Sequence, residues 1–239
     1  MATAALTGAL ALTGCGGDDA APPASAHGTS AAASTTPGAS TSEEGATSSS
    51  PPTAGASGSA LPEDWTPEEP TVLATGQKVP DDYEPATLEH PARNVPKPVM
   101  PAEAKKETEA GAQAFLNYRA DAQWYSIQTG DTSLIREVTS TDCTKCTEQY
   151  DYFDRIYEQG HWAAGGFETE KLLDESFIRR PEGGYNVPVA INSRGMIVIK
   201  DGKVSDRQES FNYDGRFDSY LYYENNSWFY LTASPRGSL

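Results

Sequence analysis

The sequence predicts an α+β domain, with three helices followed by an antiparallel sheet of four to six strands, and a long disordered tether before it. Two changes along the chain support this prediction. At Pro101 a segment rich in prolines and acids gives way to apolar residues at helical spacing, and from Gly166 onward that spacing falls towards two residues. Helices that precede strands, rather than alternate with them, are typical of an α+β domain.

Residues 1–15 are typical of the signal peptide of a lipoprotein. They form an uncharged apolar run, too short to span a bilayer, that ends in small residues and a cysteine. The run Leu12-Thr13-Gly14-Cys15 is similar to a bacterial lipobox, so we expect Cys15 to be lipidated, with palmitate among its fatty acids. Basic residues before the run are missing, and we expect the natural start codon to lie upstream. Because two acyl chains give stable anchoring, the expected location is the extracytoplasmic face of the cell membrane.

The next two segments differ in composition. Residues 16–60 contain almost only Gly, Ser, Ala, Thr and Pro and no apolar side chain larger than Ala. Such a segment cannot offset the conformational entropy lost on folding, so we expect a disordered tether. Residues 61–97 scatter apolar residues such as Trp65 and Tyr83 among prolines and acids, which predicts an irregular strap that lies partly against the domain. Residues 98–239 form the predicted domain.

The net charge of −16 limits the classes of partner. Acidic residues outnumber basic ones in the tether, the strap and the domain alike, and no basic patch alternates with aromatic residues. Such a chain repels a nucleic-acid backbone, so we expect no nucleic-acid partner.

The helices and strands are predicted from apolar spacing and from the residues at their ends. Small and apolar residues at alternating spacings of four and three predict a first helix, and capping residues delimit the others. The predicted helices run from Pro101 to Thr129, over 134–138, and from Asp142 to Gly160. The predicted strands are 167–177, 185–191, 196–199, 217–223 and 228–231. Turns are expected at Asp201-Gly202, Asp214-Gly215 and Asn225-Asn226.

Cys143 and Cys146 are the two thiols that remain once Cys15 is lipidated. An exported protein meets an oxidising compartment, so we expect these two cysteines to form a disulfide. A Cys-x-x-Cys pair at a helix start can also serve a thiol-disulfide oxidoreductase, but no βαβ pattern precedes it and its two intervening residues lack the usual proline. We expect a structural disulfide. We expect no metal, because His161 is the one further ligand nearby and leaves a zinc site incomplete.

The order of these motifs resembles a known group of proteins. The motifs are Thr129-Gly130-Asp131-Thr132, Asp142-Cys143-Thr144-Lys145-Cys146, an aromatic helix, and Gly160-His161-Trp162. Together they resemble an uncharacterised family of actinobacterial surface lipoproteins, a domain of unknown function, whose topology is similar to the nuclear-transport-factor-two-like cone fold. The resemblance covers roughly residues 98–235. It implies a curved, cone-like sheet around a cavity closed by the first helix, and it implies no established activity.

Catalytic machinery is not evident in the sequence. His161 is the only histidine of the predicted domain, and no Gly-x-Ser-x-Gly sequence is present to hold a serine nucleophile. Enzymes of the cone fold use a cavity acid, tyrosine or histidine for proton transfer, which would fall to Tyr118, Tyr125, His161 or Asp174. Core tyrosines and a turn histidine are the simpler interpretation, so we assign no catalytic residue.

The last predicted hairpin is rich in aromatic rings. Even-numbered and odd-numbered positions both carry large apolar side chains: Tyr220, Tyr222, Trp228 and Tyr230 on one parity, and Leu221, Tyr223, Phe229 and Leu231 on the other. We expect one face to join the core. The other is covered by the strap or a helix, lines a cavity, or forms an exposed surface that binds sugars or proteins.

These observations predict a membrane-anchored lipoprotein whose domain is a non-enzymatic binding or interaction module at the cell surface. The candidate ligand-binding residues are Tyr118, Tyr125, Tyr222, Trp228 and Tyr230. Besides the lipid anchor in the membrane, the expected partners are a cell-wall component, a surface protein or a small apolar ligand, and we expect no cofactor. Two alternatives stay open: a cavity enzyme of the cone fold, and a redox protein that uses Cys143 and Cys146.

Overall fold

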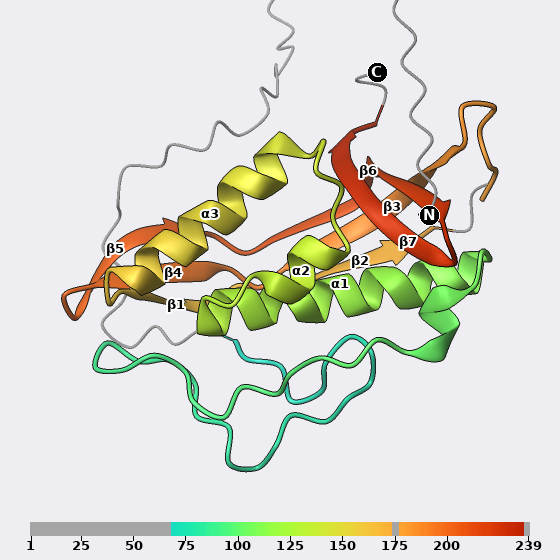
Figure 1. Cartoon of the computed structure of the whole chain (residues 1–239). Coiled ribbons are helices and arrows are strands. Elements are labelled where there is room, and N and C mark those ends of the chain that lie inside the picture. The colour runs from blue at the N-terminus through green and yellow to red at the C-terminus, as the bar shows by residue number, and fades with distance from the viewer. Residues whose placement is uncertain (1–67, 174–176, 237–239) are drawn as a thin grey trace, which may run out of the picture. The chain divides into compact units, whose positions relative to one another are not determined.

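Figure 1 shows a computed structural model of the chain, which describes residues 68–173 and 177–236. Cys15, the predicted tether and Asp174 lie outside the described residues. Helices come first and strands follow, and the helices α1, α2 and α3 lie on one side of the strands (Figure 1). The predicted α+β fold, with helices packed on antiparallel strands, is confirmed, although the strands form two sheets where one was expected.

The first helix begins later than the sequence predicts. Pro101 opens only a short 3-10 turn, because Lys106 returns to an extended backbone with φ −105° and ψ 137°. The α-helix starts after Thr108, whose side-chain oxygen accepts a hydrogen bond from Gly111 N at 3.0 Å and so caps the helix. The helical elements are η1 (Ala102–Lys105), α1 (Glu109–Thr129), α2 (Ser133–Glu137) and α3 (Thr144–Glu158).

The strands include two that the sequence does not predict. They are β1 (Trp162–Gly165), β2 (Glu168–Leu172), β3 (Gly184–Ser193), β4 (Met196–Lys200), β5 (Lys203–Gln208), β6 (Phe211–Glu224) and β7 (Ser227–Pro235). β1 consists mainly of small residues, which carry little strand signal. β5 is exposed along nearly its whole length, so its sequence lacks the apolar alternation of a half-buried strand.

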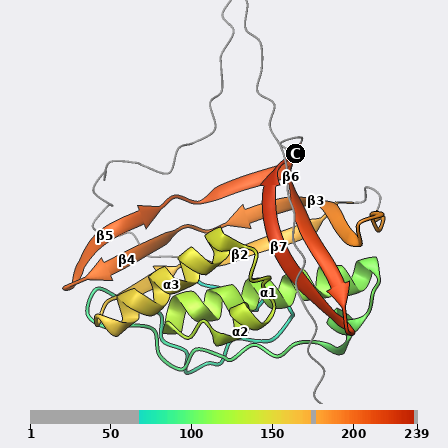
Figure 2. The same ribbon diagram turned by 45° about the horizontal axis from the view of Figure 1, so that its top comes forward.

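The strands form two antiparallel sheets that are joined by sharp bends. The strand orders are β1-β4-β5 and β2-β3-β6-β7. Along the chain β1 leads into β2, β3 into β4 and β5 into β6, so each strand of the first sheet continues into the second (Figure 2). At the bend Gly166 N donates to Gly195 O at 2.6 Å, and Arg194 N donates to Phe167 O at 3.1 Å. Gly166 and Gly195 have φ angles of 80° and 79°, which only glycine adopts without strain.

The turn predicted at Asp214-Gly215 is wrong. Both residues lie inside β6, which pairs with β3 on either side of them: Val189 faces Phe217 and Ile191 faces Tyr213. β6 therefore carries extra residues at this point and bulges. Gly215 takes the positive φ of 67° that such a bulge favours, which explains why the dipeptide looks like a turn in the sequence.

The predicted hairpin at Asn225-Asn226 is confirmed. Both asparagines have positive φ, 51° and 60°, as a two-residue turn between antiparallel strands requires. Glu224 pairs with Ser227 across this turn, so an even-numbered residue on β6 faces an odd-numbered residue on β7. Both faces of the hairpin carry aromatic rings, but an odd or even residue number alone does not show on which face a ring lies. Tyr222 stacks on Phe229 on one face, with ring centroids 4.9 Å apart, and the other face carries Leu221 with Tyr230, and Tyr223 with Trp228.

The strap contributes to the buried core. Leu73 packs with Trp124 of α1 and with Phe167, and Ala86 packs with Ile199 of β4. The described strap, drawn in cyan and green in Figure 1, therefore covers α1 and the β1-β4-β5 sheet. Among the described residues it does not cover the second face of the last hairpin, contrary to one of the arrangements considered from the sequence.

Candidate functional site

A small polar pocket lies between the helices and the sheet. Its volume is about 220 Å³. It is lined from α1 by Arg119 and Gln123, from the start of α3 by Cys143, Lys145, Cys146 and Gln149, and from the sheet chiefly by Glu168, Ser193, Met196, Gln208 and Tyr230.

The regular spacing of side chains on α1 and β2 explains why polar residues face this pocket. Arg119 and Gln123 are four residues apart on α1 and so project from the same face of the helix. On β2, Glu168 and Glu170 alternate with outward residues and share the inner face with the buried Leu172. Two acids therefore lie on a strand face that also belongs to the core.

Arg119 and Glu170 form a buried ion pair at the base of the pocket. Arg119 Nη1 donates to Glu170 Oε1 at 2.8 Å, and the side chains are only 8% and 5% exposed. The second oxygen of Glu170 accepts a hydrogen bond from the hydroxyl of the buried Ser219. The guanidinium carbon of Arg119 lies 3.5 Å from the centre of the Tyr230 ring, so the cation is held by both a carboxylate and an aromatic face. With the ion pair formed, this group of four residues carries no net charge.

Glu168 differs from its neighbour because its charge has no direct partner. Among the described residues its carboxyl group makes neither a hydrogen bond nor an ion pair. Burial raises the pKa of Glu168 to about 7, the nearby carboxylate of Glu170 adds to the increase, and the guanidinium of Arg119 opposes it. A carboxyl group of this kind changes charge near neutral pH, which is typical of functional sites.

Two further polar side chains in the pocket lack partners. Gln123 is 8% exposed and Ser193 is 4% exposed, and within the described part of the chain neither side chain makes a hydrogen bond. Ser193 pairs with Glu168 across β3 and β2, so the two residues lie side by side on the inner face of the sheet. Because buried polar groups normally have hydrogen-bond partners, these groups are free to bind water or a ligand.

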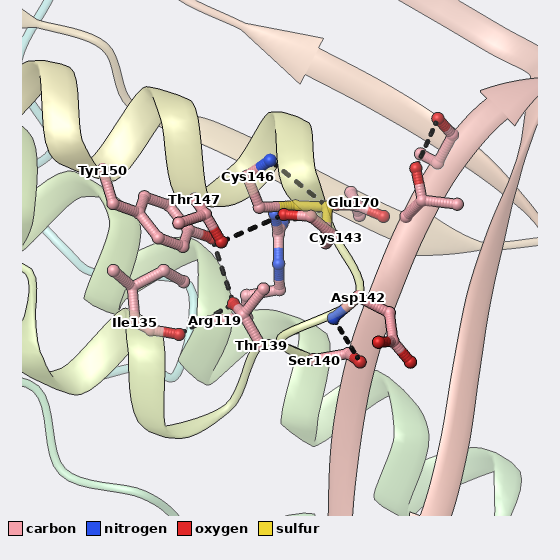
Figure 3. The surroundings of a disulfide bond; sticks show 12 residues. Arg119, Ile135, Thr139, Ser140, Asp142, Cys143, Cys146, Thr147, Tyr150 and Glu170 are labelled. Atoms are coloured by element: carbon pink, nitrogen blue, oxygen red, sulfur yellow. Dashed lines mark hydrogen bonds and ion pairs between the residues drawn. A yellow bond between two sulfur atoms is a disulfide. The ribbon is translucent and has the colours of Figure 1, made fainter.

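The predicted disulfide between Cys143 and Cys146 is confirmed, and it forms part of the wall of the pocket. Figure 3 shows it at the start of α3, with the side chain of Arg119 directed towards it. The loop that leads into α3 pairs with β7: Tyr230 N donates to Val138 O at 2.9 Å, and Ser140 N donates to Tyr230 O at 2.7 Å. These hydrogen bonds hold the loop, and with it the disulfide, next to Tyr230 at the wall of the pocket.

The structure separates the five predicted ligand-binding residues. Tyr230 lines the polar pocket. Trp228, two residues earlier on β7, is 2% exposed in the main core and donates its indole N–H to Lys106 O at 2.9 Å. Tyr118 is also in the core, and Tyr125 is half-buried on α1; neither lines a described pocket. His161 follows α3 and likewise does not line the polar pocket.

Tyr222 lies on the opposite face of the sheet, in an open groove of about 900 Å³. Tyr220 and Leu231 line the same groove, and Arg179 and Arg180 border it. The groove is a second concave surface, and it shares no lining residue with the polar pocket.

Sequence reasoning missed the residues at the centre of the polar pocket, namely Arg119, Glu168 and Glu170. Two signals point to them in retrospect. Arg119 lies four residues after the buried Phe115 in the first helix, within the region of its apolar face. The two acids of β2 have the same parity as Leu172, which places three side chains on one face.

Metal and membrane signals are absent from the described part of the chain. In residues 68–173 and 177–236 no three His, Cys, Asp or Glu side chains lie close enough together to hold a metal ion. No described helix is both long enough and apolar enough to cross a membrane.

Comparison with known proteins gives a family but no function. No curated protein and no solved structure matches the chain significantly. One family model matches residues 81–234, which include the end of the strap, the helices that the structure describes and nearly all of the two described sheets. The chain therefore belongs to the DUF6318 family, a family of unknown function.

Proposed function

We propose that this protein is an exported lipoprotein of the bacterial cell surface, anchored through Cys15, whose domain binds a small ligand in the polar pocket. The sequence supports the anchor through the lipobox-like Leu12-Thr13-Gly14-Cys15 and the low-complexity segment that follows it. The family resemblance noted in the sequence supports an actinobacterial surface location and a cone-like cavity fold.

One observation carries the binding function: the pocket contains three polar side chains that the described protein does not pair. Glu168, Gln123 and Ser193 all line the same 220 Å³ space, and two of them are more than nine-tenths buried. Their polar atoms are accessible from the pocket and are not enclosed in the core. A bound ligand with complementary groups can therefore pair with them. The pocket is smaller than the roughly 300–1,000 Å³ typical of drug-sized ligands, which favours a small one.

A screen by nuclear magnetic resonance tests the binding function. The full chain with the substitution Cys15→Ser, which cannot carry lipid, is labelled with ¹⁵N and titrated with small polar fragments. We expect the amide signals of Gly166 and Ser193 at the pocket to shift with saturable dependence on fragment concentration. Fragments that shift only signals of the outer groove around Tyr222 would move the ligand site there, and a complete lack of saturable shifts would refute the binding function.

The anchor has its own test. In a bacterial host that lipidates exported proteins, we expect labelled palmitate to enter the chain and to be lost with Cys15→Ser. Retention of the label in that variant would refute anchoring at Cys15.

A second candidate function is proton-transfer catalysis, and the pKa of Glu168 favours it. A carboxyl group with a pKa of about 7 is half-ionised near neutral pH, as a general acid or base requires. Native mass spectrometry of the chain from an exporting host distinguishes the two functions. A molecule that co-purifies and remains unchanged on long incubation supports binding, whereas its conversion, abolished by Glu168→Gln, supports catalysis.

A further inference from the structure

The charges around the polar pocket determine the kind of ligand that fits it. Arg119 on α1 is neutralised by Glu170 and covered by the Tyr230 ring. Its Nε is buried and without a partner, and it does not reach the solvent-accessible space. Glu170 already neutralises this guanidinium, so an anionic ligand would add an unbalanced negative charge beside Glu168.

Among the described residues, Glu168 is the one charged residue of the inner pocket that lacks a counter-ion. The titratable and charged groups around it are Arg119 on α1, Glu170 on β2, Tyr230 on β7 and Lys145 on α3. Lys145 is exposed at the rim and makes no ion pair with Glu168. β3, β4 and β5 contribute only uncharged groups to the lining, through Ser193, Met196 and Gln208. With Glu168 ionised, the inner pocket therefore carries a net charge of about −1.

We propose that the polar pocket binds a small organic cation that carries a primary ammonium group, with Glu168 as its counter-ion. This inference rests on the proposed binding function and names the chemical class of its ligand. An ammonium group donates three hydrogen bonds, and three acceptors without partners line the pocket: the Glu168 carboxylate, the Gln123 amide oxygen and the Ser193 hydroxyl oxygen. Ile127, Met196 and the disulfide provide apolar surface for the carbon skeleton. The described residues offer too few ligands for a metal cation.

The charge state of Glu168 makes the expected binding dependent on pH. The ligand binds the ionised carboxylate, and the pKa of this carboxyl group without ligand is about 7. The ionised fraction falls about tenfold between pH 8 and pH 6, so the affinity falls by the same factor. A ligand that instead accepts a hydrogen bond from the protonated carboxyl group would show the opposite dependence, with tighter binding at pH 6.

Matched probes test the charge preference directly. The ¹⁵N-labelled full chain with Cys15→Ser is titrated with butylamine, butanol and butyrate, and with benzylamine, benzyl alcohol and benzoate, at pH 6 and pH 8. Within each set the skeleton is constant and the charge varies. We expect the amines to bind most tightly, to shift the Gly166 and Ser193 signals, and to weaken about tenfold at pH 6. Glu168→Gln should abolish the preference for amines, whereas Glu148→Gln, an equal charge change at an exposed position of α3, should leave it intact.

The other outcomes separate the two proposals. Tighter binding of the carboxylates or alcohols in the pocket, or amine binding that Glu168→Gln does not change, would overturn the inference while the binding function stands. An affinity for amines that rises on acidification would also overturn it. Failure of all six probes to shift the pocket signals would count against both proposals.

Discussion

Replacing Glu168 with glutamine should stabilise the protein at alkaline pH and leave its stability unchanged in acid. The carboxyl group of Glu168 has a pKa of about 7 in the folded protein, against an ordinary value of 4.5. A pKa shift of one unit corresponds to about 1.4 kcal/mol, so Glu168→Gln should raise the unfolding free energy at alkaline pH by at most about 3 kcal/mol. The side chain is half-buried and open to the pocket, so solvent reduces this figure, and we expect about 2 kcal/mol.

The sign follows from proton linkage. The folded state keeps Glu168 protonated up to about pH 7, whereas the unfolded chain releases the proton near pH 4.5. The stability that this proton provides is complete below pH 4.5 and is lost as the pH rises through 7. Glutamine stays neutral at every pH, so its advantage over wild type appears between these two values and is full at pH 8.

Urea unfolding at pH 4 and pH 8, followed by tryptophan fluorescence, measures this difference. Glu148→Gln is the matched control, because Glu148 is exposed on α3, and it should change the unfolding free energy by less than about 0.5 kcal/mol at both pH values. If Glu168→Gln destabilises the chain at pH 8, or changes stability equally at both pH values, then Glu168 does not carry an unmatched buried charge and the reasoning fails.

Two further substitutions test the supports of the pocket. Arg119→Met should lower the unfolding free energy by about 3–5 kcal/mol, since it leaves Glu170 buried without its cation, and the double variant with Glu170→Gln should recover much of the loss in the same urea assay. Gly166→Ala should lower the melting temperature, because the added carbon would lie 2.9 Å from Ile127 Cδ1 at a φ of 80°. Gly160→Ala, at a φ of 75° but with open space around it, should cost only about 1 kcal/mol, and equal losses in the two alanine variants would refute the packing argument.

The sequence predicts well the elements whose local signals agree with their packing. The third helix, the hairpin at Asn225-Asn226 and the disulfide all follow from short motifs that the structure preserves. Prediction from the sequence fails where two local signals compete, or where contacts with neighbouring elements determine the structure of a segment. Thr108 and Pro101 are both good helix starts, and the extended Lys106 between them separates two helices. β5 becomes a strand because it pairs with β4, and nothing in its own polar sequence indicates this.

The pocket was harder to predict because its residues come together only through the fold. Arg119 and Glu170 are 51 residues apart, and the closed ion pair depends on α1 lying across β2. Aromatic residues gave a stronger sequence signal, but Trp228 and Tyr118 serve the core. Rings near the end of a sheet bury large apolar areas whatever the function. An acid without a partner on the buried face of a strand has no such structural use.

For this physical reason we regard Glu168, and not the aromatic residues, as the stronger indication of a functional site. Glu170, two residues away, shows how this fold neutralises an inward acid: a guanidinium, a hydroxyl and an aromatic ring surround it and its partner. No such arrangement surrounds Glu168, although a glutamine there would keep the shape and remove the charge. Domains of this size have a total stability of only about 5–15 kcal/mol, so an unmatched carboxylate that removes some 2 kcal/mol at neutral pH is a substantial burden. Sites where activity or binding requires it commonly hold such destabilising groups. A cation bound at Glu168 lowers the pKa of that carboxyl group and restores the lost stability, so the stability gained from the ligand should increase as the pH rises through 7.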